Sequence, residues 1–438
     1  MTISIPFIFF SFLFIHHYMK MGKRLDIAGL ILLLFGISAL FSIIMYVVDI
    51  HIEASDTYIP SYGATLFYCG FLFICLFPFL KFSNLSYTEI SPSKHPRSFK
   101  VLAWLAFFWF LMTFFIDINA IIQVLSGDMA TLRAAIYEGE GRLIQSEASK
   151  IPFLVRAPWT LFNYIFKCSW VMIFFAFYAK SIQKLPWVYF IFFLLASTNA
   201  ILDSILGLDR SKVAYWIIGI GANYMFFNKN MGQREKKVVK MSIFVLVSLA
   251  VVYLSLMTES RFEDRTFGTS AVGGSLGSII TYFGQPFPNF CFFFDNFDCK
   301  WTTLACLFPT FYYFFFPDEP SGLVLVQQTL DAYIAYRTGV FYTFMGTIMI
   351  MAGKSIMIIF CLFYSLISYI VLRSNSKKRT TIATIYVYYA LSSVLTLGLF
   401  AYYYGNPLLD LSVITSFIII KNFFQQGFKV NNDTKAFV

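Results

Sequence analysis

The chain has 438 residues, of which 58% are hydrophobic, 20% aromatic and only 13% charged, and its mean hydropathy is +0.70. Because soluble proteins carry about a quarter charged residues, this composition excludes an ordinary soluble domain. The net charge of +10 comes from segments between apolar runs, so it reports on membrane topology and gives no reason to expect nucleic acid as a partner.

Apolar runs recur along the whole chain, and a run of about 20 residues can cross a bilayer core of about 30 Å. The sequence predicts an all-α polytopic integral membrane protein, a single membrane domain over 1–438, with about eleven transmembrane helices. Lys20, Lys23 and Arg24 follow the first run instead of preceding it, so we expect a retained span and no cleaved signal peptide. The expected spans are 2–18, 27–49, 63–80, 101–125, 158–179, 185–206, 213–228, 241–257, 340–372 (one long or broken element), 381–403 and 408–424.

The connecting segments alternate in charge. One set carries 21 Lys+Arg against 4 acids, and the other carries 10 against 17. Since short cytoplasmic loops are rich in lysine and arginine, the basic set is predicted to be cytoplasmic, which puts the N-terminus outside and the C-terminus inside. The cytoplasmic loops are about 19–26, 81–100, 180–184, 229–240 and 373–380.

Three outer segments are longer than a simple turn, about 49–62, 127–158 and 258–339. The first is short and acidic, and the second can form a small amphipathic helix. The third contains semi-apolar pieces at 275–294 and 301–316, which glycine, proline and charged residues interrupt. Such pieces are typical of short helices that lie at the interface or enter the membrane partway, so we expect a large outer loop of this kind.

Arginines on the outer side are the first candidate binding groups, because a guanidinium stays charged and binds phosphate bidentately. Arg210 lies in a very short loop, LDRSKVAYW, and Arg261 and Arg265 are one helical turn apart. A group of such arginines at membrane depth suits a lipid-linked diphosphate. The alternative for each is an interfacial anchor or a pair with a neighbouring acid. The remaining outer arginines are Arg133, Arg142, Arg156 and Arg337.

Charges inside the predicted spans are a second signal. Asp117, Lys167 and Asp203 interrupt apolar runs, and such residues usually face a bundle interior or cavity. Asp203 and Arg210 are seven residues apart, so a continuous helix would place them on one face. Tyr282 and Gln285 lie in the aromatic stretch YFGQPFPNF, which suits sugar binding. Snorkelling at the interface and an aromatic belt are the respective alternatives.

Several expected catalytic groups are missing from the sequence. Neither of the two longer outer segments contains a histidine, so a histidine base is not expected there. The chain contains no phosphate-binding, dinucleotide-binding or zinc-protease motif, and we expect neither a metal nor a cofactor.

The layout and the stretches at 208–216 and 258–290 resemble the O-antigen or oligosaccharide repeat-unit polymerases (Wzy-type). The resemblance implies metal-independent glycosyl transfer on the outer face of the bacterial inner membrane. A glycan on undecaprenyl diphosphate would be moved as a block onto the next lipid-linked repeat unit. In this family outer-loop arginines engage the diphosphates, which here implies Arg210, Arg261 and Arg265. Glu263, Asp264 or Asp331 would orient or deprotonate the acceptor hydroxyl, and the choice among these three acids stays open.

This chain departs from one described family spacing, an arginine eleven residues before a glycine, because Val272 and Leu276 stand at those positions. Related O-antigen ligases use a histidine in the large loop, and its absence favours a polymerase. The expected partners are the lipid bilayer, the undecaprenyl-diphosphate-linked oligosaccharide, a chain-length regulator and a flippase.

Two other functions stay open. A flippase or transporter of the same lipid-linked oligosaccharide would need charges deeper within several spans and smaller outer loops. Another lipid-phosphate-sugar-dependent glycosyltransferase would depend on Asp49 or Glu53 in the first outer segment instead of the arginines of the large one.

Overall fold

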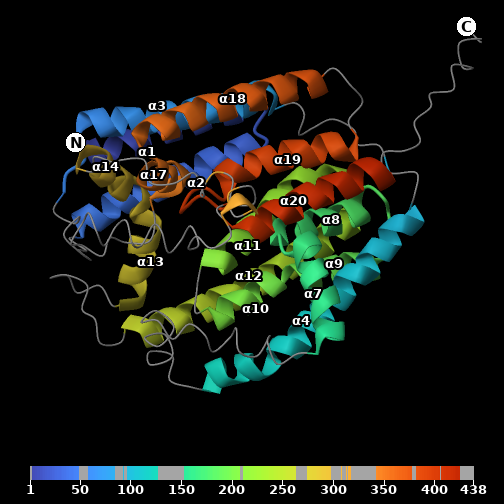
Figure 1. Ribbon diagram of the computed structural model, residues 1–438. Coiled ribbons are helices and arrows are strands. Elements are labelled where there is room, and N and C mark those ends of the chain that lie inside the picture. Colours follow the sequence, from blue (N-terminus) through green and yellow to red (C-terminus); the bar gives the residue numbers. More distant parts are fainter. Residues whose placement is uncertain are drawn as a thin grey trace, which may run out of the picture.

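The computed structural model describes residues 2–48, 58–83, 92, 96–126, 152–207, 211–262, 274–296, 307, 312, 314–316, 342–376, 381–404 and 406–424. Within these ranges the chain is helical and contains no strand (Figure 1). The helices are η1 (Thr2–Ser4), α1 (Ile5–Lys20), α2 (Ile27–Val47), α3 (Tyr62–Lys81), α4 (Pro96–Ser126), α7 (Phe153–Phe166), α8 (Ser169–Ser181), α9 (Trp187–Ser197), α10 (Asn199–Leu206), α11 (Ser211–Phe227), η4 (Asn228–Asn230), α12 (Gln233–Phe262), α13 (Gly274–Gly284), α14 (Pro286–Asn296), α17 (Thr343–Ala352), α18 (Lys354–Ser376), α19 (Ile382–Thr396), α20 (Pro407–Ile419) and η5 (Ile420–Phe424).

Helices that follow one another along the chain pack as hairpins. Contacts join α1 to α2, α8 to α9, α10 to α11 and α18 to α19, and each pair is connected by six residues or fewer. Short connections make such neighbours antiparallel, so the bundle has two ends. We call the end where α2 and α10 stop and α11 starts the acidic end, and the end where α1, α8 and α18 stop the basic end, after their connecting segments.

Within the described part of the chain, six helical segments are long and apolar enough to cross a membrane, or seven if the bent pair α7–α8 counts as one span. For the residues that the structure describes, these findings confirm the all-helical class and several helices that can span a membrane, whereas the predicted count of about eleven spans is not confirmed. The six segments are Thr2–Lys20, Ile27–Val47, Tyr62–Lys81, Pro96–Val124, Trp187–Leu206 and Lys354–Ser374.

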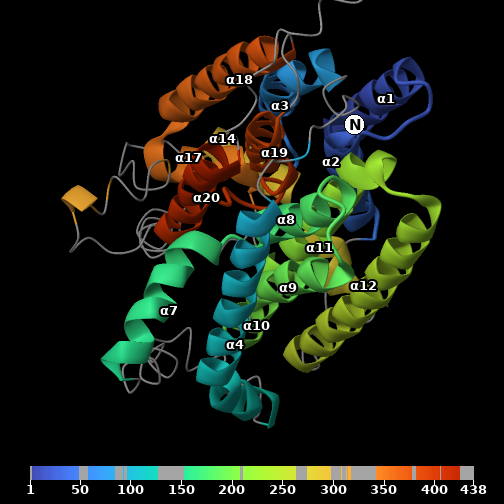
Figure 2. The ribbon, with the colours of Figure 1, turned by 90° about the vertical axis from the view of Figure 1, so that its right-hand side faces the viewer.

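The outward faces of the bundle are apolar. On α18 an exposed stripe of large apolar side chains follows the helical period, and α12 and α7, on opposite flanks of the bundle in Figure 2, also expose apolar side chains. Contiguous apolar surface of this extent is typical of contact with lipid. The stripe on α18 consists of Ile359, Leu362, Phe363, Leu366 and Ile370.

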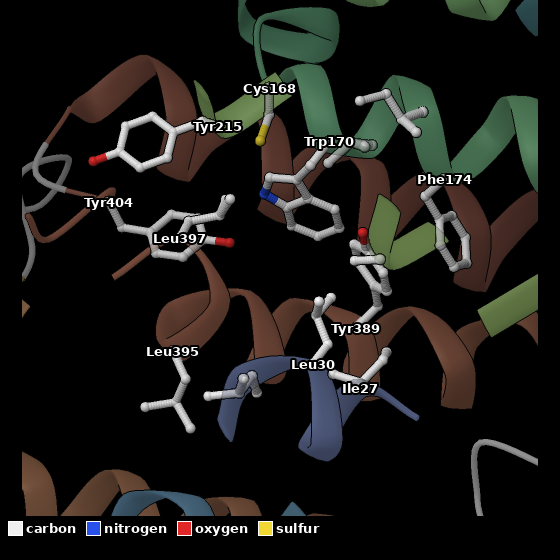
Figure 3. Close-up of a cluster of buried hydrophobic side chains, with 14 of the residues drawn as sticks. Ile27, Leu30, Cys168, Trp170, Phe174, Tyr215, Tyr389, Leu395, Leu397 and Tyr404 are labelled. Carbon is white, nitrogen blue, oxygen red and sulfur yellow. The ribbon is translucent and has the colours of Figure 1, made fainter. Parts of the chain in front are cut away.

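The core forms around α8, whose residues from Ser169 to Ala179 are all buried. The ring of Trp170 lies 5.1 Å from that of Tyr389 and 5.7 Å from that of Tyr386, measured between centroids. Figure 3 shows side chains from α2, α8, α11 and α19 converging on this cluster. Because aromatic pairs at such distances add to the gain from burial, α8 is the central element of the bundle.

The span expected at 158–179 is not one continuous helix but two helices with a break between them. Helices α7 and α8 are bent by 73° relative to each other, and α20 satisfies the backbone groups that the break frees. The hydroxyl of Ser412 accepts from the amide of Cys168 at 3.1 Å and donates to the carbonyl of Ile165 at 2.8 Å, while Thr415 donates to the carbonyl of Tyr164 at 3.0 Å. A break at membrane depth needs such partners, since no water is there to replace them.

Three short helices, α13, α14 and α17, lie at the acidic end. Figure 1 shows α13 running across the direction of the long helices, and it packs against α2. Ser38 and Ser42 of α2 donate to the carbonyls of Phe283 at 2.7 Å and Gly284 at 2.6 Å. A Cβ at Gly284 would lie 2.8 Å from the carbonyl oxygen of Phe41, so this close approach of two backbones requires glycine.

The element expected at 340–372 is broken, as one of the two predicted forms has it. Gly353, with φ +89°, separates α17 from α18, in a region that favours glycine. The amides of Tyr342 and Thr343 both donate to the carbonyl of Phe400 at 3.0 Å, and that of Phe344 donates to the carbonyl of Gly398 at 2.8 Å. The start of α17 is therefore held by the segment that follows α19.

The end of α14 is tied to the start of α3. The carboxylate of Asp295 accepts hydrogen bonds from Ser61 at 3.0 Å and from the hydroxyl of Tyr58. Ser61 is also the N-cap of α3, where it accepts from the amide of Ala64. Burial and the hydrogen bond to Asp295 raise the pKa of Tyr58, so Tyr58 stays a donor at every ordinary pH.

At the basic end Glu235 connects two hairpins. Its carboxylate lies 3.3 Å from the ammonium of Lys180 and 3.6 Å from that of Lys184, and it accepts from the amide of Gly232 at 3.0 Å. Burial acts to raise the pKa of Glu235, but the amide of Gly232 and the two lysines outweigh it and lower that pKa. Glu235 is thus ionised when it holds the α8–α9 turn to the start of α12.

Candidate functional site

Lys167 and Asp203 form an ion pair inside the bundle. The ammonium of Lys167, which is the residue at the break between α7 and α8, lies 2.5 Å from the carboxylate of Asp203 in α10. The two side chains are 24% and 20% exposed, so the pair is neither sealed in the core nor free in solvent. Charged residues within membrane spans are costly and commonly mark substrate or ion sites.

Lys212, in the first turn of α11, adds a second ammonium. Its Nζ donates to the backbone carbonyl of Asp203 at 3.4 Å, and its charge also acts on the Asp203 carboxylate. Only four residues, 207–210, connect α10 to α11. Arg210 lies in this connection, outside the described residues and two positions before Lys212.

Asp117 of α4 is the second carboxylate of the site. It lies within electrostatic reach of Asp203 and Lys167, and it has no hydrogen bond or ion pair within the described part of the chain. We call Asp117, Lys167, Asp203 and Lys212 the charged cluster. The charged cluster contains two ammonium groups and two carboxylates. Among the described residues, the Asp203 carboxylate contacts a cation directly and the Asp117 carboxylate does not.

Hydrogen bonds from two tryptophan indoles hold α4 against α7 on the basic-end side of this cluster. Trp109 donates to the side-chain oxygen of Asn163 at 3.2 Å, and Trp159 donates to the hydroxyl of Thr113 at 3.1 Å. Asp117 is four residues beyond Thr113 and therefore on the same face of α4. This register directs Asp117 toward the side of α4 that faces α7 and α10.

The cluster lies in the acidic half of the bundle. At 1.5 Å of rise per residue, Asp117 is about 32 Å from Pro96 along α4, Asp203 is about 24 Å from Trp187, and Lys167 is about 21 Å from Ser181. Measured from the basic end of a hydrocarbon core of about 30 Å, these positions fall in its far half or at its far boundary.

Asn199 adds an unsatisfied amide next to the cluster. It lies one turn before Asp203 on α10, it is 2% exposed, and neither its side-chain nitrogen nor its side-chain oxygen has a hydrogen-bond partner within the described residues. A buried amide without partners costs free energy, so a group of this kind in a native fold calls for an explanation. A ligand or water at the cluster would supply the missing bonds.

The predicted site residues are distributed as follows. Asp203 lies in the charged cluster, and the backbone of Arg261 lies in the last turn of α12. Arg156 is on the exposed face of α7, and the ring of Tyr282 lies 5.6 Å from that of Phe400, which gives Tyr282 a packing role. Gln285 is half-buried at the joint between α13 and α14. Predicted residues outside the described ranges are Asp49, Glu53, Arg133, Arg142, Arg210, Glu263, Asp264, Arg265, Asp331 and Arg337.

Sequence reasoning missed the composition of the cluster. It found Asp117, Lys167 and Asp203 as separate charges but gave Lys167 no partner, and it passed over Lys212 within the stretch LDRSKVAYW. The signal was the match between two carboxylates and one lysine in neighbouring outer halves of spans, since unpaired charges there are rare. Among the described residues no group of three or more histidine, cysteine, aspartate and glutamate side chains could hold a metal ion.

The chain was compared with models of protein families, with curated proteins and with solved structures, and none of the three comparisons found a match.

Proposed function

We propose that this protein is a membrane glycosyltransferase that polymerises undecaprenyl-diphosphate-linked oligosaccharide repeat units. It transfers the growing glycan as a block onto a new lipid-linked unit on the outer face of the bacterial inner membrane. In this proposal the chain crosses the membrane about eleven times, and the acidic end faces outward. The product is a surface polysaccharide of the O-antigen or capsule kind.

One observation carries the proposal: the Lys167–Asp203 pair lies at membrane depth beside the short connection that contains Arg210. A lipid-linked diphosphate brings its charge to the membrane boundary, where cations on the protein can meet it. Arg210 belongs to that connection, and Lys212 belongs to the first turn of α11 that follows it. Lys167 is at the break between α7 and α8. Cations placed where a diphosphate departs stabilise the charge that develops on it.

The outer-loop arginines complete this assignment. Arg210, Arg261 and Arg265 bind the diphosphates of donor and acceptor, and an acid accepts the proton of the attacking hydroxyl. The short helix α13 supports the proposal because it provides a layer of backbone and aromatic rings at the end of the bundle where the sugars would lie.

A carrier for the same lipid-linked oligosaccharide is the second candidate, and the broken helices favour it. The bend of 73° between α7 and α8 and the break at Gly353 resemble the discontinuous helices of many secondary transporters. The carrier would use the charged cluster as its substrate site and would move the lipid head group past it.

The test is deletion of the gene in its own host, followed by complementation. A polymerase predicts collapse of the long-chain polysaccharide ladder to single-repeat species, with restoration by the wild-type gene. Arg210→Gln and Arg261→Gln should fail to restore the ladder. Arg234→Gln makes the same change on an exposed residue at the basic end and should restore it.

The other outcomes separate the two candidates. An unchanged ladder in the deletion strain would contradict the polymerase. Loss of even the single-repeat product, with lipid-linked units retained on the cytoplasmic face, would establish the carrier instead.

A further inference from the structure

We propose that Asp117 is the general base of the transfer reaction, the group that accepts the proton of the attacking acceptor hydroxyl. This inference rests on the proposed function, and it assigns a role that the sequence left open among acids of the large outer segment.

The two carboxylates of the cluster differ in what they contact. Asp203 is bound directly by Lys167 at 2.5 Å, and Lys212 lies against its backbone carbonyl. Asp117 has neither a hydrogen bond nor an ion pair among the described residues, although both Lys167 and Asp203 act on it electrostatically. Within the described residues no donor contacts the Asp117 carboxylate, so it can accept a proton, whereas the direct contact with Lys167 stabilises Asp203 as an anion and makes it the weaker base.

The position of Asp117 suits a proton acceptor that stays fixed while substrates change. It lies on a helix of 31 residues, one turn after Thr113, which hydrogen-bonds to Trp159 of α7. This contact fixes the part of α4 that carries Asp117. A base on a rigid helix keeps its geometry better than one on a loop.

The cations beside Asp117 suit the other half of the reaction. Lys167 contacts the carboxylate of Asp203 and acts electrostatically on Asp117, and Lys212 donates to the backbone carbonyl of Asp203, so positive charge is directed to the same small region. A site with a free carboxylate next to ammonium groups can activate a hydroxyl and hold a departing phosphate at once. Asn199, whose buried amide lacks partners, can donate to and accept from a sugar bound there.

The step balances with these groups alone. The hydroxyl oxygen of the acceptor sugar forms a bond to the anomeric carbon of the donor glycan, and the bond from that carbon to the diphosphate oxygen breaks. The proton of the hydroxyl moves to a carboxylate oxygen of Asp117. The bonding electron pair leaves with undecaprenyl diphosphate, whose new charge the cations stabilise. Attack from the face opposite the leaving group inverts the anomeric centre.

The experiment uses purified full-length protein in lipid vesicles with lipid-linked repeat units as substrate. Wild type, Asp117→Asn, Asp117→Glu and Asp295→Asn are compared for turnover, for KM and for the rise in unfolding midpoint that the lipid-linked unit causes. Asp117→Asn removes a charge from the membrane region and keeps the side-chain shape, so it is expected to fold. Asp295→Asn makes the same change on a carboxylate that Tyr58 and Ser61 hold at the acidic end.

The expected result is a loss of turnover of about 100-fold or more for Asp117→Asn. KM and the substrate-induced shift in midpoint should stay near the wild-type values, Asp117→Glu should recover part of the turnover, and Asp295→Asn should behave as wild type. A merely structural role would lower the midpoint and the substrate shift together with turnover.

Two outcomes would overturn this inference and leave the proposed function standing. In the first, Asp117→Asn keeps at least half of the wild-type turnover, and in the second, Asp117→Asn raises KM without changing turnover. Asp117→Glu covers the case in which Asp117→Asn does not fold. If Asp117→Glu folds and keeps full turnover although its carboxylate is displaced, the inference is also overturned. A wild-type protein that makes no polymer would overturn the proposed function, and the role of Asp117 with it.

Discussion

The ammonium of Lys167 lies 2.5 Å from the carboxylate of Asp203, although the two residues are separated by 36 positions and belong to different helix hairpins. The pair joins the break between α7 and α8 to the end of α10. It thereby connects the point where the backbone is least regular to the short turn that precedes α11.

Lys167→Met is expected to destabilise the protein, because it leaves the Asp203 carboxylate half-buried without its cation. Breaking a buried pair costs about 3–5 kcal/mol, and the partial exposure of this pair reduces the expected loss to at most about 3 kcal/mol. Unfolding midpoints in detergent measure the change. The double variant Lys167→Met with Asp203→Leu should recover the midpoint but not the polymer ladder, and recovery of both would contradict a role for the pair in function.

Ser412→Ala tests the support of the break by α20. The substitution removes the acceptor for the buried amide of Cys168 and the donor to Ile165, so we expect a loss of about 1–3 kcal/mol from the unsatisfied amide. Ser416→Ala is the matched control, because Ser416 reaches the Ile165 carbonyl only at 3.4 Å and accepts no bond from Cys168. Equal midpoints for the two variants would show that Ser412 does not stabilise the break.

Gly284→Ala should disturb the contact of α13 with α2. Its Cβ would meet the backbone of Phe41 at 2.8 Å, and since backbone atoms cannot move aside cheaply, the expected cost is about 1–3 kcal/mol. Gly70→Ala is the control, because nothing lies within 4 Å of a Cβ at that position in α3. An alanine in the interior of a helix is favoured over glycine by about 1 kcal/mol, so this control should be neutral or stabilising. A stable Gly284→Ala variant would mean that α13 does not pack closely on α2.

Lys229 should make stability depend on pH at the basic end. Burial lowers the pKa of Lys229 from 10.5 to about 8. Between pH 8 and 10 the unfolded chain therefore binds more protons than the folded one, and stability rises with pH in this window. The unfolding midpoint of the wild type should therefore rise relative to that of Lys229→Met between pH 8 and pH 10, which changes the gap between the two proteins. Comparing the gap cancels the titration of other groups, and a gap that does not change would contradict the prediction.

Local patterns predicted the helical class and the positions of most elements. Apolar runs were sufficient to predict helices, because a segment in lipid must form its backbone hydrogen bonds within itself and a helix does so. The break within 340–372 was foreseen as one of two forms, but its position at Gly353 was not predicted. The close contact at Gly284 falls within a stretch predicted to contain short helices.

The bend between α7 and α8 was not predicted, for a physical reason. Residues 158–179 form an apolar run that only single polar residues such as Lys167 interrupt, and neither glycine nor proline stands at 167 or 168. What permits the break is a hydroxyl at Ser412, 244 residues later than Cys168, and no local rule relates the two. The same limit applies to the site: Asp203 was predicted, while its partner Lys167 and its neighbour Lys212 depend on how three hairpins pack.

The hydrogen bonds from the start of α17 to the carbonyls of Gly398 and Phe400 also impose an order on biosynthesis. A ribosome delivers α17 to the membrane before the residues that hold it, so this half-helix cannot settle until α19 and the segment after it have been inserted. Chains that stop before residue 398 should therefore insert their early helices yet leave α17 without its anchor, and surveillance proteases should cleave them there first.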